Sequence, residues 1–320
     1  MTVQTCRVLG LCTGGLLTAS GLVACSQDRP PPPARSADAR APRQAEVDAP
    51  KELENSTPYR ARIGRGTELY LPPWFAPKRG GYDLIVHFHG LGKIQEANVE
   101  RAQLNVAVVS VNLGVGTEAY AGMFRDPTAF DRLLADTDAE IARSGRAPGA
   151  RLRRVALSAW SAGFVCVAKL LAQPAHAVLL ADGFFSSFTD LKKRTINEAP
   201  LEKFTTLIAA ATRGDKLFAI THTAIPTSKY PSVEETVGKL LDMASIEKVP
   251  SDVGPQEMHE QYAVDRGSFH VRGYDGTTAR AHIRQIRRMG ETLYPYLKER
   301  WAKEDDGASP ARVASPSPAP

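Results

Sequence analysis

The sequence predicts an α/β fold with a mostly parallel central sheet and helices on both faces. Between about residues 59 and 302, short apolar runs alternate with segments whose apolar residues recur at helical spacing. Several of these runs, such as residues 106–113, are almost continuously apolar. A continuous run is typical of a parallel strand that is buried on both faces.

The expected strands are apolar runs that end at turn-forming residues. Pro72 and Pro73 end the first run, because proline removes a hydrogen bond from the sheet, and Asp182-Gly183 ends the fifth. The expected strands, in order, are residues 67–71, 82–88, 106–113, 155–160, 177–181, 217–221 and 269–274.

The expected helices have apolar residues three or four positions apart. In one of them Phe130, Leu133, Thr137 and Ile141 share a face, and Pro127 lies near its start. The expected helices are residues 94–104, 127–143, 164–171, 201–212, 233–243 and 279–297. Two polar segments show no regular pattern: residues 186–200 and 247–266.

The first 25 residues are typical of a bacterial export signal. Arg7 precedes the apolar residues 8–24, which indicates a secretory signal peptide at residues 1–24. The motif L-V-A-C that ends at Cys25 resembles a lipobox, in which the cysteine is lipidated. We therefore expect a lipid anchor at Cys25 in the bacterial cell envelope, and in the outer membrane because Ser26 follows instead of Asp. An uncleaved membrane anchor is the alternative, although the stretch is short and rich in glycine.

The two ends of the chain differ in composition from its middle. Residues 25–58 are rich in proline and charge and are expected to form a disordered tether, and residues 303–320 a disordered tail. Residues 59–302 remain as one domain. Cys166 is then the one cysteine of that domain, so no disulfide is expected, and its apolar neighbours predict a buried, inert thiol.

The charge of the chain argues against a nucleic-acid partner. The net charge is +5, and the 40 Lys and Arg residues are spread along the chain and not gathered with aromatic residues in a stripe. The sequence does not indicate an oligomeric state.

The most distinctive segment surrounds Ser161. An apolar, strand-like run leads to this serine, Ala159 and Gly163 stand two positions to either side, and a helical segment follows. This is the pattern of a nucleophile elbow, in which strand and helix backbones approach so closely that only small side chains fit. The alternative is a buried strand-turn-helix unit whose serine caps the helix.

Three features together resemble the α/β-hydrolase superfamily of serine esterases and lipases. They are H-F-H-G-L-G at residues 87–92, A-W-S-A-G at residues 159–163, and a histidine after the last expected strand. Ala159 replaces the usual first glycine of the elbow. The resemblance covers nearly all of residues 59–302 and implies an α/β-hydrolase fold with a catalytic Ser-His-Asp triad.

The resemblance implies Ser161 as the nucleophile, which needs a base within hydrogen-bond reach. It also implies that the backbone N–H groups of Leu91 and Ala162 form the oxyanion hole, with Gly90 allowing the turn and His89 beside the pocket.

His87 and His89 also have other interpretations. Because they are two apart on one expected strand, they share a face and could bind a metal, but no Asp or His follows immediately. Simple packing of the pair is the third possibility. We expect neither a metal nor another cofactor.

Five histidines follow the serine: His176, His222, His259, His270 and His282. His282 follows the last strand and a short loop, where a side chain can reach the elbow. We therefore assign His282 as the base, with His270, inside that strand, as the alternative.

The acid is harder to place. The usual position, after residues 217–221, has no carboxylate, because the chain there continues His222-Thr223. We expect Asp182, at the end of the preceding strand, to orient the base. Glu234, Glu235 and Asp275 are alternatives, and Asp182-Gly183 could simply form a turn.

Aromatic residues near these positions could line an apolar pocket or belong to the core: Tyr120, Trp160, Phe184, Phe185 and, with them, His222. The predicted function is a serine hydrolase that cleaves a small carboxylic ester through an acyl-enzyme. An amidase or peptidase with the same triad, and an inactive binding protein on this scaffold, remain as alternatives.

Overall fold

The computed structural model describes residues 57–307 of the chain. The predicted signal peptide, the predicted lipidation site Cys25, all of the predicted tether except residues 57 and 58, and residues 308–320 of the predicted tail lie outside the described residues. Within residues 57–307, no helix combines the length and the apolar character needed to cross a bilayer.

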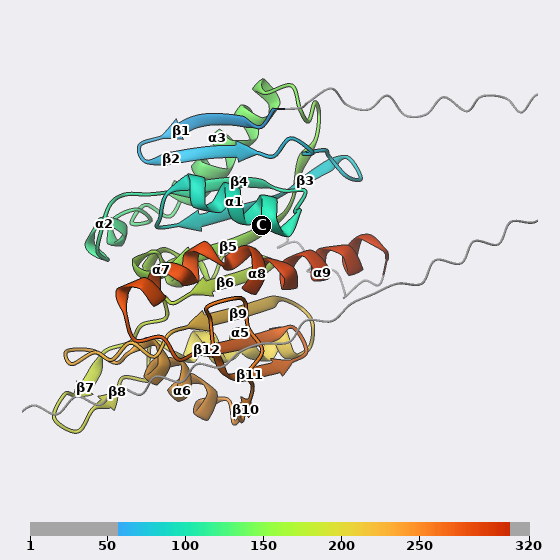
Figure 1. The fold of residues 1–320 in the computed structure, drawn as a ribbon. Helices are drawn as coiled ribbons and strands as arrows, with labels where there is room; N and C mark the ends of the chain where they lie inside the picture. Colours follow the sequence, from blue (N-terminus) through green and yellow to red (C-terminus); the bar gives the residue numbers. More distant parts are fainter. Residues whose placement is uncertain (1–56, 308–320) are drawn as a thin grey trace, which may run out of the picture. The chain divides into compact units, whose positions relative to one another are not determined.

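Strands and helices alternate through the described residues (Figure 1). The strands are β1 Tyr59–Gly64, β2 Thr67–Leu71, β3 Gly81–Phe88, β4 Ala107–Val111, β5 Arg151–Trp160, β6 Ala177–Ala181, β7 Phe188–Asp190, β8 Thr195–Ile196, β9 Leu217–His222, β10 Val249–Pro250, β11 Glu260–Arg266 and β12 Phe269–Tyr274. The helices are α1 Gly92–Ala102, α2 Glu118–Ala121, α3 Ala129–Arg143, α4 Phe164–Leu170, α5 Glu202–Thr212, α6 Val233–Met243, α7 Ala279–Arg287, α8 Met289–Thr292 and α9 Tyr294–Asp305, with a 3₁₀ turn at Ser161–Gly163.

Within residues 57–307, ten of the strands form one sheet in the order β1-β2-β4-β3-β5-β6-β9-β12-β11-β10, and β7 pairs with β8 separately. The central strands from β4 to β12 in this order are parallel, and the two strands at each edge are antiparallel to their neighbours. Parallel neighbours need crossover connections, and the helices supply them.

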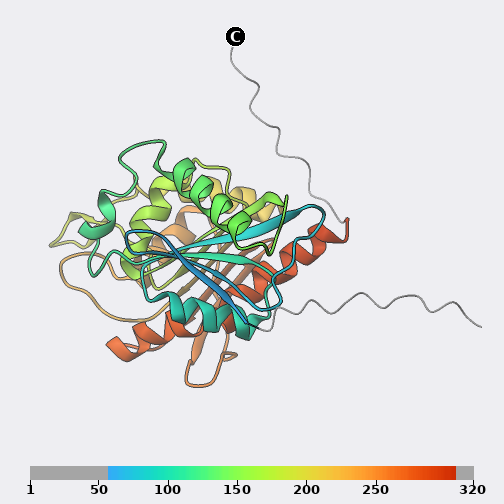
Figure 2. The same cartoon turned by 90° about the horizontal axis from the view of Figure 1, so that it is seen from above.

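Helices cover both faces of the sheet (Figure 2). The core on one face includes residues of α3, α4, α5 and α6, and the core on the other includes residues of α1, α7, α8 and α9. Along β3, Val86 and Phe88 belong to the first core and Ile85 to the second, as the alternation of side chains in a strand requires. This architecture confirms the predicted α/β fold with a mostly parallel central sheet and helices on both faces.

All the expected strands are present, but β1, β7, β8, β10 and β11 were not predicted. Of these five, β1 and β11 are the longest. Both alternate between inward and exposed residues, and their exposed positions carry charged side chains such as Arg60 and Arg266. They read as polar segments because they pair at the edges of the sheet, where one face of a strand meets water.

The expected last helix is divided into α7, α8 and α9. Pro295 lies at the start of α9, where its missing N–H costs no helical hydrogen bond, and the ring prevents the preceding helix from continuing through it. Helix α9 continues to Asp305, beyond the predicted domain boundary at residue 302. Glu304 and Asp305 form ion pairs there with Arg154 and Arg153 of β5.

Candidate active site

The residues of interest lie after the carboxyl ends of neighbouring strands. Ser161 follows β5, Asp182 follows β6, and His89 follows β3, while His282 lies on α7 after β12. In a parallel sheet these ends share one edge, which is where such folds place their sites. His89, Ser161 and Asp182 also have positive φ angles of 74°, 48° and 43°. Positive φ is uncommon outside glycine and concentrates at functional sites.

Ser161 has the geometry of a nucleophile elbow. It begins the 3₁₀ turn between β5 and α4, and its side chain caps neither that turn nor α4. The helix-cap interpretation is therefore wrong. A Cβ atom on Gly163 would lie 2.1 Å from the carbonyl oxygen of Phe88, and Ala159 is fully buried. Close packing therefore explains why small residues, Ala159 and Gly163, stand on either side of Ser161.

Gly183 is a second close approach, and it yields a prediction. A Cβ atom there would lie 2.5 Å from the backbone nitrogen of Ser161, so backbone would have to move. We expect Gly183→Ala to lower the free energy of unfolding by about 1–3 kcal/mol in urea titrations. Gly122→Ala is the matched control, because a Cβ atom added to Gly122 would meet no atom within 4 Å. Equal stabilities of the two variants would contradict the close approach.

Asp182 and His282 form a hydrogen-bonded pair. The Nδ1 atom of His282 lies 2.6 Å from Oδ2 of Asp182. Because a carboxylate can only accept, Nδ1 carries the proton and Nε2 remains as the basic nitrogen. Asp182 is 1% exposed. Thr223 also donates to both of its oxygens, from its N–H at 2.9 Å and its hydroxyl at 2.8 Å.

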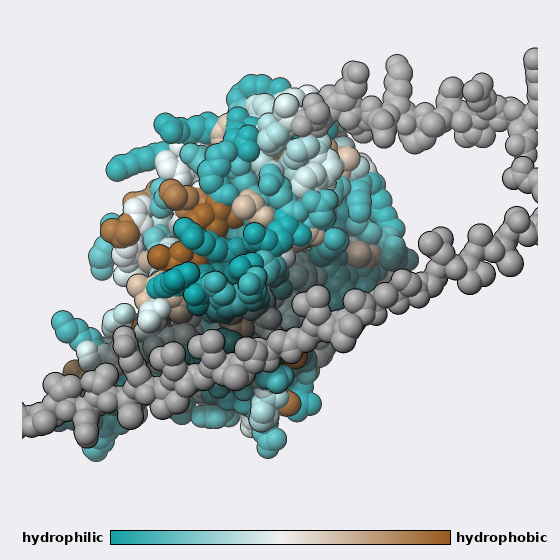
Figure 3. Space-filling model, viewed as in Figure 1, coloured by the Kyte–Doolittle hydropathy of each residue, from teal (hydrophilic) through white to brown (hydrophobic). Residues whose placement is uncertain are grey.

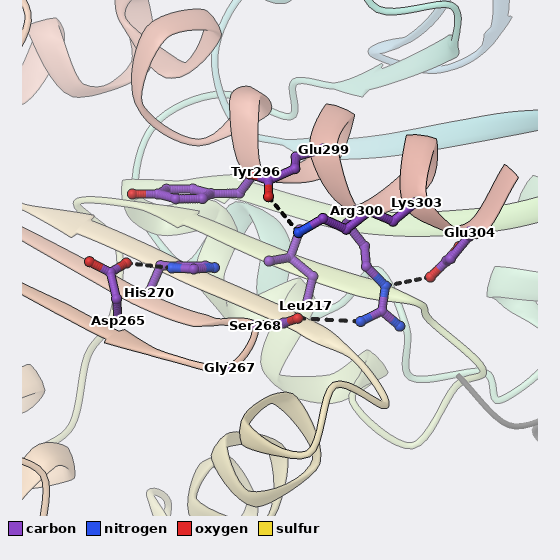
Figure 4. A pocket seen from close by; sticks show the side chains of 10 residues that line it. All are labelled: Leu217, Asp265, Gly267, Ser268, His270, Tyr296, Glu299, Arg300, Lys303 and Glu304. Atoms are coloured by element: carbon purple, nitrogen blue, oxygen red, sulfur yellow. Dashed lines mark hydrogen bonds and ion pairs between the residues drawn. The ribbon is translucent and has the colours of Figure 1, made fainter. Parts of the chain in front are cut away.

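The alternative base lies elsewhere. His270 pairs with Asp265 at 2.6 Å and stacks on Tyr296 at 4.0 Å between ring centroids (Figure 4). These residues line a cavity of about 390 Å³ beside Leu217, the first residue of β9, and therefore at the amino ends of the strands. The structure thus separates His270 from the edge that carries Ser161.

The alternative acids have other positions. Glu235 pairs with Arg194 and caps α6 together with Ser232. Glu234 lies on the same helix, and Asp275 is exposed. Asp182 is the carboxylate that the structure pairs with His282.

The turn after β3 lies directly beside the elbow. Phe88 pairs with Ala159 in the sheet register, so His89-Gly90-Leu91 runs next to Trp160-Ser161. Leu91 is the residue before α1, and Ala162 lies in the first turn after β5. The first N–H groups of a helix have no partner inside it, so both are available to a ligand.

His87 and His89 do not share a face, because the positive φ of His89 redirects the chain after Phe88. His87 is completely buried, and its ring bonds to Ser158 Oγ and to the carbonyl oxygen of His89, both at 2.9 Å. The expectation of a shared face is therefore wrong. Among residues 57–307, no three His, Cys, Asp or Glu side chains are grouped so that they could hold a metal.

Burial of His87 makes stability depend on pH. Burial lowers its pKa from 6.5 to about 3, so below pH 6.5 the unfolded chain binds a proton that the folded chain does not. Stability should therefore fall as the pH drops from 6.5 to about 3, by ~1.4 kcal/mol per pH unit for this group. In His87→Gln, the free energy of unfolding measured by urea titration should fall less steeply with decreasing pH across this window, because one proton fewer is taken up on unfolding. An unchanged slope would show that His87 is protonated in the fold.

Trp160 connects the turn to His282. Its ring stacks on His89 with centroids 4.8 Å apart and lies 4.6 Å from the ring of His282. Its indole N–H donates to the carbonyl oxygen of His282 at 3.0 Å. Burial, and secondarily the nearby His282, lowers the pKa of His89, which favours its neutral form.

A cleft with two lobes opens beside Ser161. The larger lobe, of about 630 Å³, is lined by His89, Val115, Gly116, Thr117, Trp160, Ser161, Ala162, Phe164, Val165, Phe185, Ser186, Tyr230 and His282. The smaller lobe, of about 280 Å³, is lined by Ser161, Asp182, Phe185, Thr223, Ile225, Thr227, Tyr230, Val233, Ala279 and His282.

Some of the expected pocket residues line the cleft, and others are buried away from it. His89, Trp160 and Phe185 line the larger lobe, and Gly90 lies behind Trp160. Tyr120 and Phe184 are completely buried in the core. His222 is also buried, outside the lining of both lobes, and bonds to Tyr262 and to Thr223. Cys166 is buried as expected, and burial raises its pKa to about 12.

Two residues of the site were not predicted. Thr223 contacts Asp182 although 41 positions separate them, and Tyr230 lines both lobes. The signal for Thr223 was present, since it follows His222 where the resemblance leads one to expect the acid. Tyr230 lies in a loop, where no periodic pattern marks a residue.

The chain is similar to several solved structures at low sequence identity. No protein-family model and no curated protein matches the chain. Solved structures do match. A ferric enterobactin esterase from Salmonella typhimurium has 13% identity and a TM-score of 0.44, and the match covers 78% of this chain and 60% of that one. An uncharacterised protein from Capnocytophaga ochracea has 12% identity and a TM-score of 0.42, with coverages of 75% and 64%.

A feruloyl esterase module from Clostridium thermocellum is a third match, with 12% identity and a TM-score of 0.40 over 75% of this chain and 86% of that one. The chain spans only 60% and 64% of the length of the Salmonella and Capnocytophaga proteins. Because these identities and TM-scores are low, an assignment of function must rest on the geometry of the site itself.

Proposed function

We propose that this protein is a serine hydrolase that cleaves a carboxylic ester through an acyl-enzyme on Ser161. The observation that carries the proposal is the partly buried hydrogen bond between Asp182 and His282. It stands at the edge of the sheet where Ser161 occupies a strained turn, and Ser161 and His282 line the same two lobes.

In this mechanism the Ser161 hydroxyl attacks the ester carbonyl and passes its proton to Nε2 of His282. The N–H groups of Leu91 and Ala162 stabilise the negative charge that develops on the carbonyl oxygen. His282 then protonates the departing alcohol. Water, deprotonated by the same nitrogen, attacks the acyl-enzyme and releases the acid. Asp182 stays ionised, holds the tautomer of His282 and stabilises its protonated form.

Asp182→Asn should lower kcat by about 10⁴-fold. The N–H of Thr223 donates to Oδ1, so the amide oxygen of asparagine takes that position and its NH₂ group faces Nδ1 of His282. The imidazole must then accept through Nδ1 and carry its proton on Nε2, where it cannot act as a base. Steady-state kinetics on a nitrophenyl ester measures the loss.

Glu235→Gln is the control for this prediction. It removes the charge that pairs with Arg194 and caps α6, and it should leave kcat within a few-fold of the wild type. Near-wild-type activity in Asp182→Asn would exclude Asp182 as the acid.

The proposal is tested by rapid mixing of the protein with nitrophenyl butyrate. An acyl-enzyme mechanism predicts release of nitrophenol, with a burst of up to one equivalent when deacylation is slower than acylation. An inactive binding protein on this scaffold would give neither a burst nor turnover. Parallel assays with the matching nitroanilide distinguish an amidase, which uses the same groups, from an esterase.

A further inference from the structure

The lining of the cleft carries almost no charge. The acidic and basic side chains in its lining are His89, Asp182 and His282, and neither Lys, Arg nor Glu contributes to either lobe. The oxygens of Asp182 already accept from Thr223 and from His282. A charged group on a substrate would therefore lose its hydration in the cleft without gaining a partner there.

Aromatic and exposed apolar side chains surround the same cleft. Phe185 and Tyr230 line both lobes and meet edge to face, with ring centroids 6.3 Å apart. Three large apolar side chains nearby are exposed. Leu91 lies in the proposed oxyanion turn, Val115 lines the larger lobe, and Ile283 follows His282 in the chain. Figure 3 shows hydrophobic residues gathered on the visible face over the region of α1, α2 and α7.

From these features we propose that the substrate is an uncharged ester with a bulky apolar or aromatic group, and that Phe185 and Tyr230 select it. The inference rests on the proposed function. The reacting carbonyl lies where the lobes meet, so one part of the ester enters the larger lobe and the other the smaller lobe. Both parts face uncharged walls, whichever lobe holds the acyl group.

The charge of the substrate is tested with two esters of the same acyl chain length. We expect kcat/KM for nitrophenyl butyrate to exceed that for the nitrophenyl monoester of succinic acid by about 100-fold or more. Equal values overturn the inference. If Ser161 nevertheless reacts with a neutral fluorophosphonate, the proposed function stands and only the substrate class is wrong.

The aromatic wall is tested with Phe185→Ala. This variant should lower kcat/KM for methyl benzoate by about 10-fold or more and change that for methyl acetate much less, because neither part of methyl acetate is large enough to contact the wall. Leu191→Ala is the control, since Leu191 is an exposed apolar residue that lines neither lobe. Equal losses on both esters would overturn the assignment of the wall.

A separate observation concerns the hydrogen bonds behind Asp182. His222 bonds through Nδ1 to the carbonyl oxygen of Thr223 at 3.0 Å, and its Nε2 lies 2.5 Å from the hydroxyl of Tyr262. A carbonyl oxygen only accepts, so Nδ1 carries the proton and Nε2 accepts from Tyr262. Burial lowers the pKa of His222, which keeps this ring neutral. A series of hydrogen bonds therefore runs from Tyr262 on β11 through His222, Thr223 and Asp182 to His282. The donor and the acceptor of each bond are defined.

From this series of hydrogen bonds we infer that Thr223 is a positioning residue for the catalytic pair. It stands where the usual acid would follow β9, and it supplies two donors in place of that acid. Two donors from one residue prevent rotation of the carboxylate, which leaves Oδ2 directed at His282. His222 and Tyr262 hold Thr223 in turn. This role is additional to the triad and explains how an acid at the end of β6 can be fixed.

Thr223→Val removes the hydroxyl donor with little change of shape and keeps the backbone donor. We expect kcat to fall about 10- to 100-fold with KM nearly unchanged. The acidic limb of the kcat/KM profile should move to higher pH, because a carboxylate with one donor fewer attracts the imidazolium more strongly. Thr223→Ser should restore kcat to within a few-fold, and Tyr262→Phe should have a smaller effect than Thr223→Val.

Thr236→Val is the matched control. Thr236 is also completely buried and donates its hydroxyl to a carbonyl oxygen, that of Ser232, but it lies on α6 away from Asp182. It should lose a similar amount of thermal stability and keep both kcat and the pH profile. Loss of kcat in Thr223→Val without a shift of the pH profile, or without rescue by serine, would overturn the positioning role.

Discussion

Ser161→Ala should lower kcat for ester hydrolysis by about 10⁴- to 10⁶-fold and change the free energy of unfolding by less than about 1 kcal/mol. Under the proposal, the variant removes the oxygen that forms the acyl-enzyme, and it leaves the turn, the pair of Asp182 and His282, and the cleft in place. What remains is the acceleration that binding and the oxyanion donors provide without a nucleophile. Steady-state kinetics and urea titration of the same preparation measure both quantities.

Ser187→Ala is the control for this variant, because Ser187 is an exposed serine outside the lining of both lobes. It should keep wild-type kinetics. Retention of turnover in Ser161→Ala, at a rate that purification does not reduce, would show that another group attacks the ester.

His282→Ala should cause a loss of similar size, about 10⁶-fold in kcat, because the serine hydroxyl is a poor nucleophile without its base. The backbone oxygen that accepts from Trp160 is kept in this variant, so the wall of the cleft is preserved. Added imidazole should restore part of the activity by occupying the space that the ring leaves.

His270→Ala is the matched histidine variant. It removes the stacking on Tyr296 and the pairing with Asp265, so it should cost stability and leave kcat within a few-fold. The opposite result, with activity lost in His270→Ala and kept in His282→Ala, would reverse the assignment of the base.

The sequence predicted the parts of this site that depend on local patterns. The small residues around Ser161 are required by atoms within a few ångströms, and such a requirement leaves a visible motif. The order of strands and helices places Asp182 directly after β6 and His282 on the helix that follows β12. These elements were recognisable because their apolar runs and helical periodicity are strong.

Other features depend on contacts between distant segments and could not be predicted. Thr223 reaches Asp182 only because β6 and β9 are neighbours in the sheet. His89 turns away from His87 because of a positive φ that no side-chain pattern marks. Strand β11, which is second from the edge of the sheet, supplies Tyr262, and its alternating polar residues made the strand hard to recognise from the sequence.

Reaction with a fluorophosphonate, followed by intact-mass and peptide mass spectrometry, tests the central claim most directly. The proposal predicts one phosphonyl group per chain, attached to Ser161, and slow or undetectable labelling in His282→Ala, because the reagent needs the same activated hydroxyl as an ester. An unlabelled wild-type protein, or a label carried by a residue other than Ser161, would contradict it.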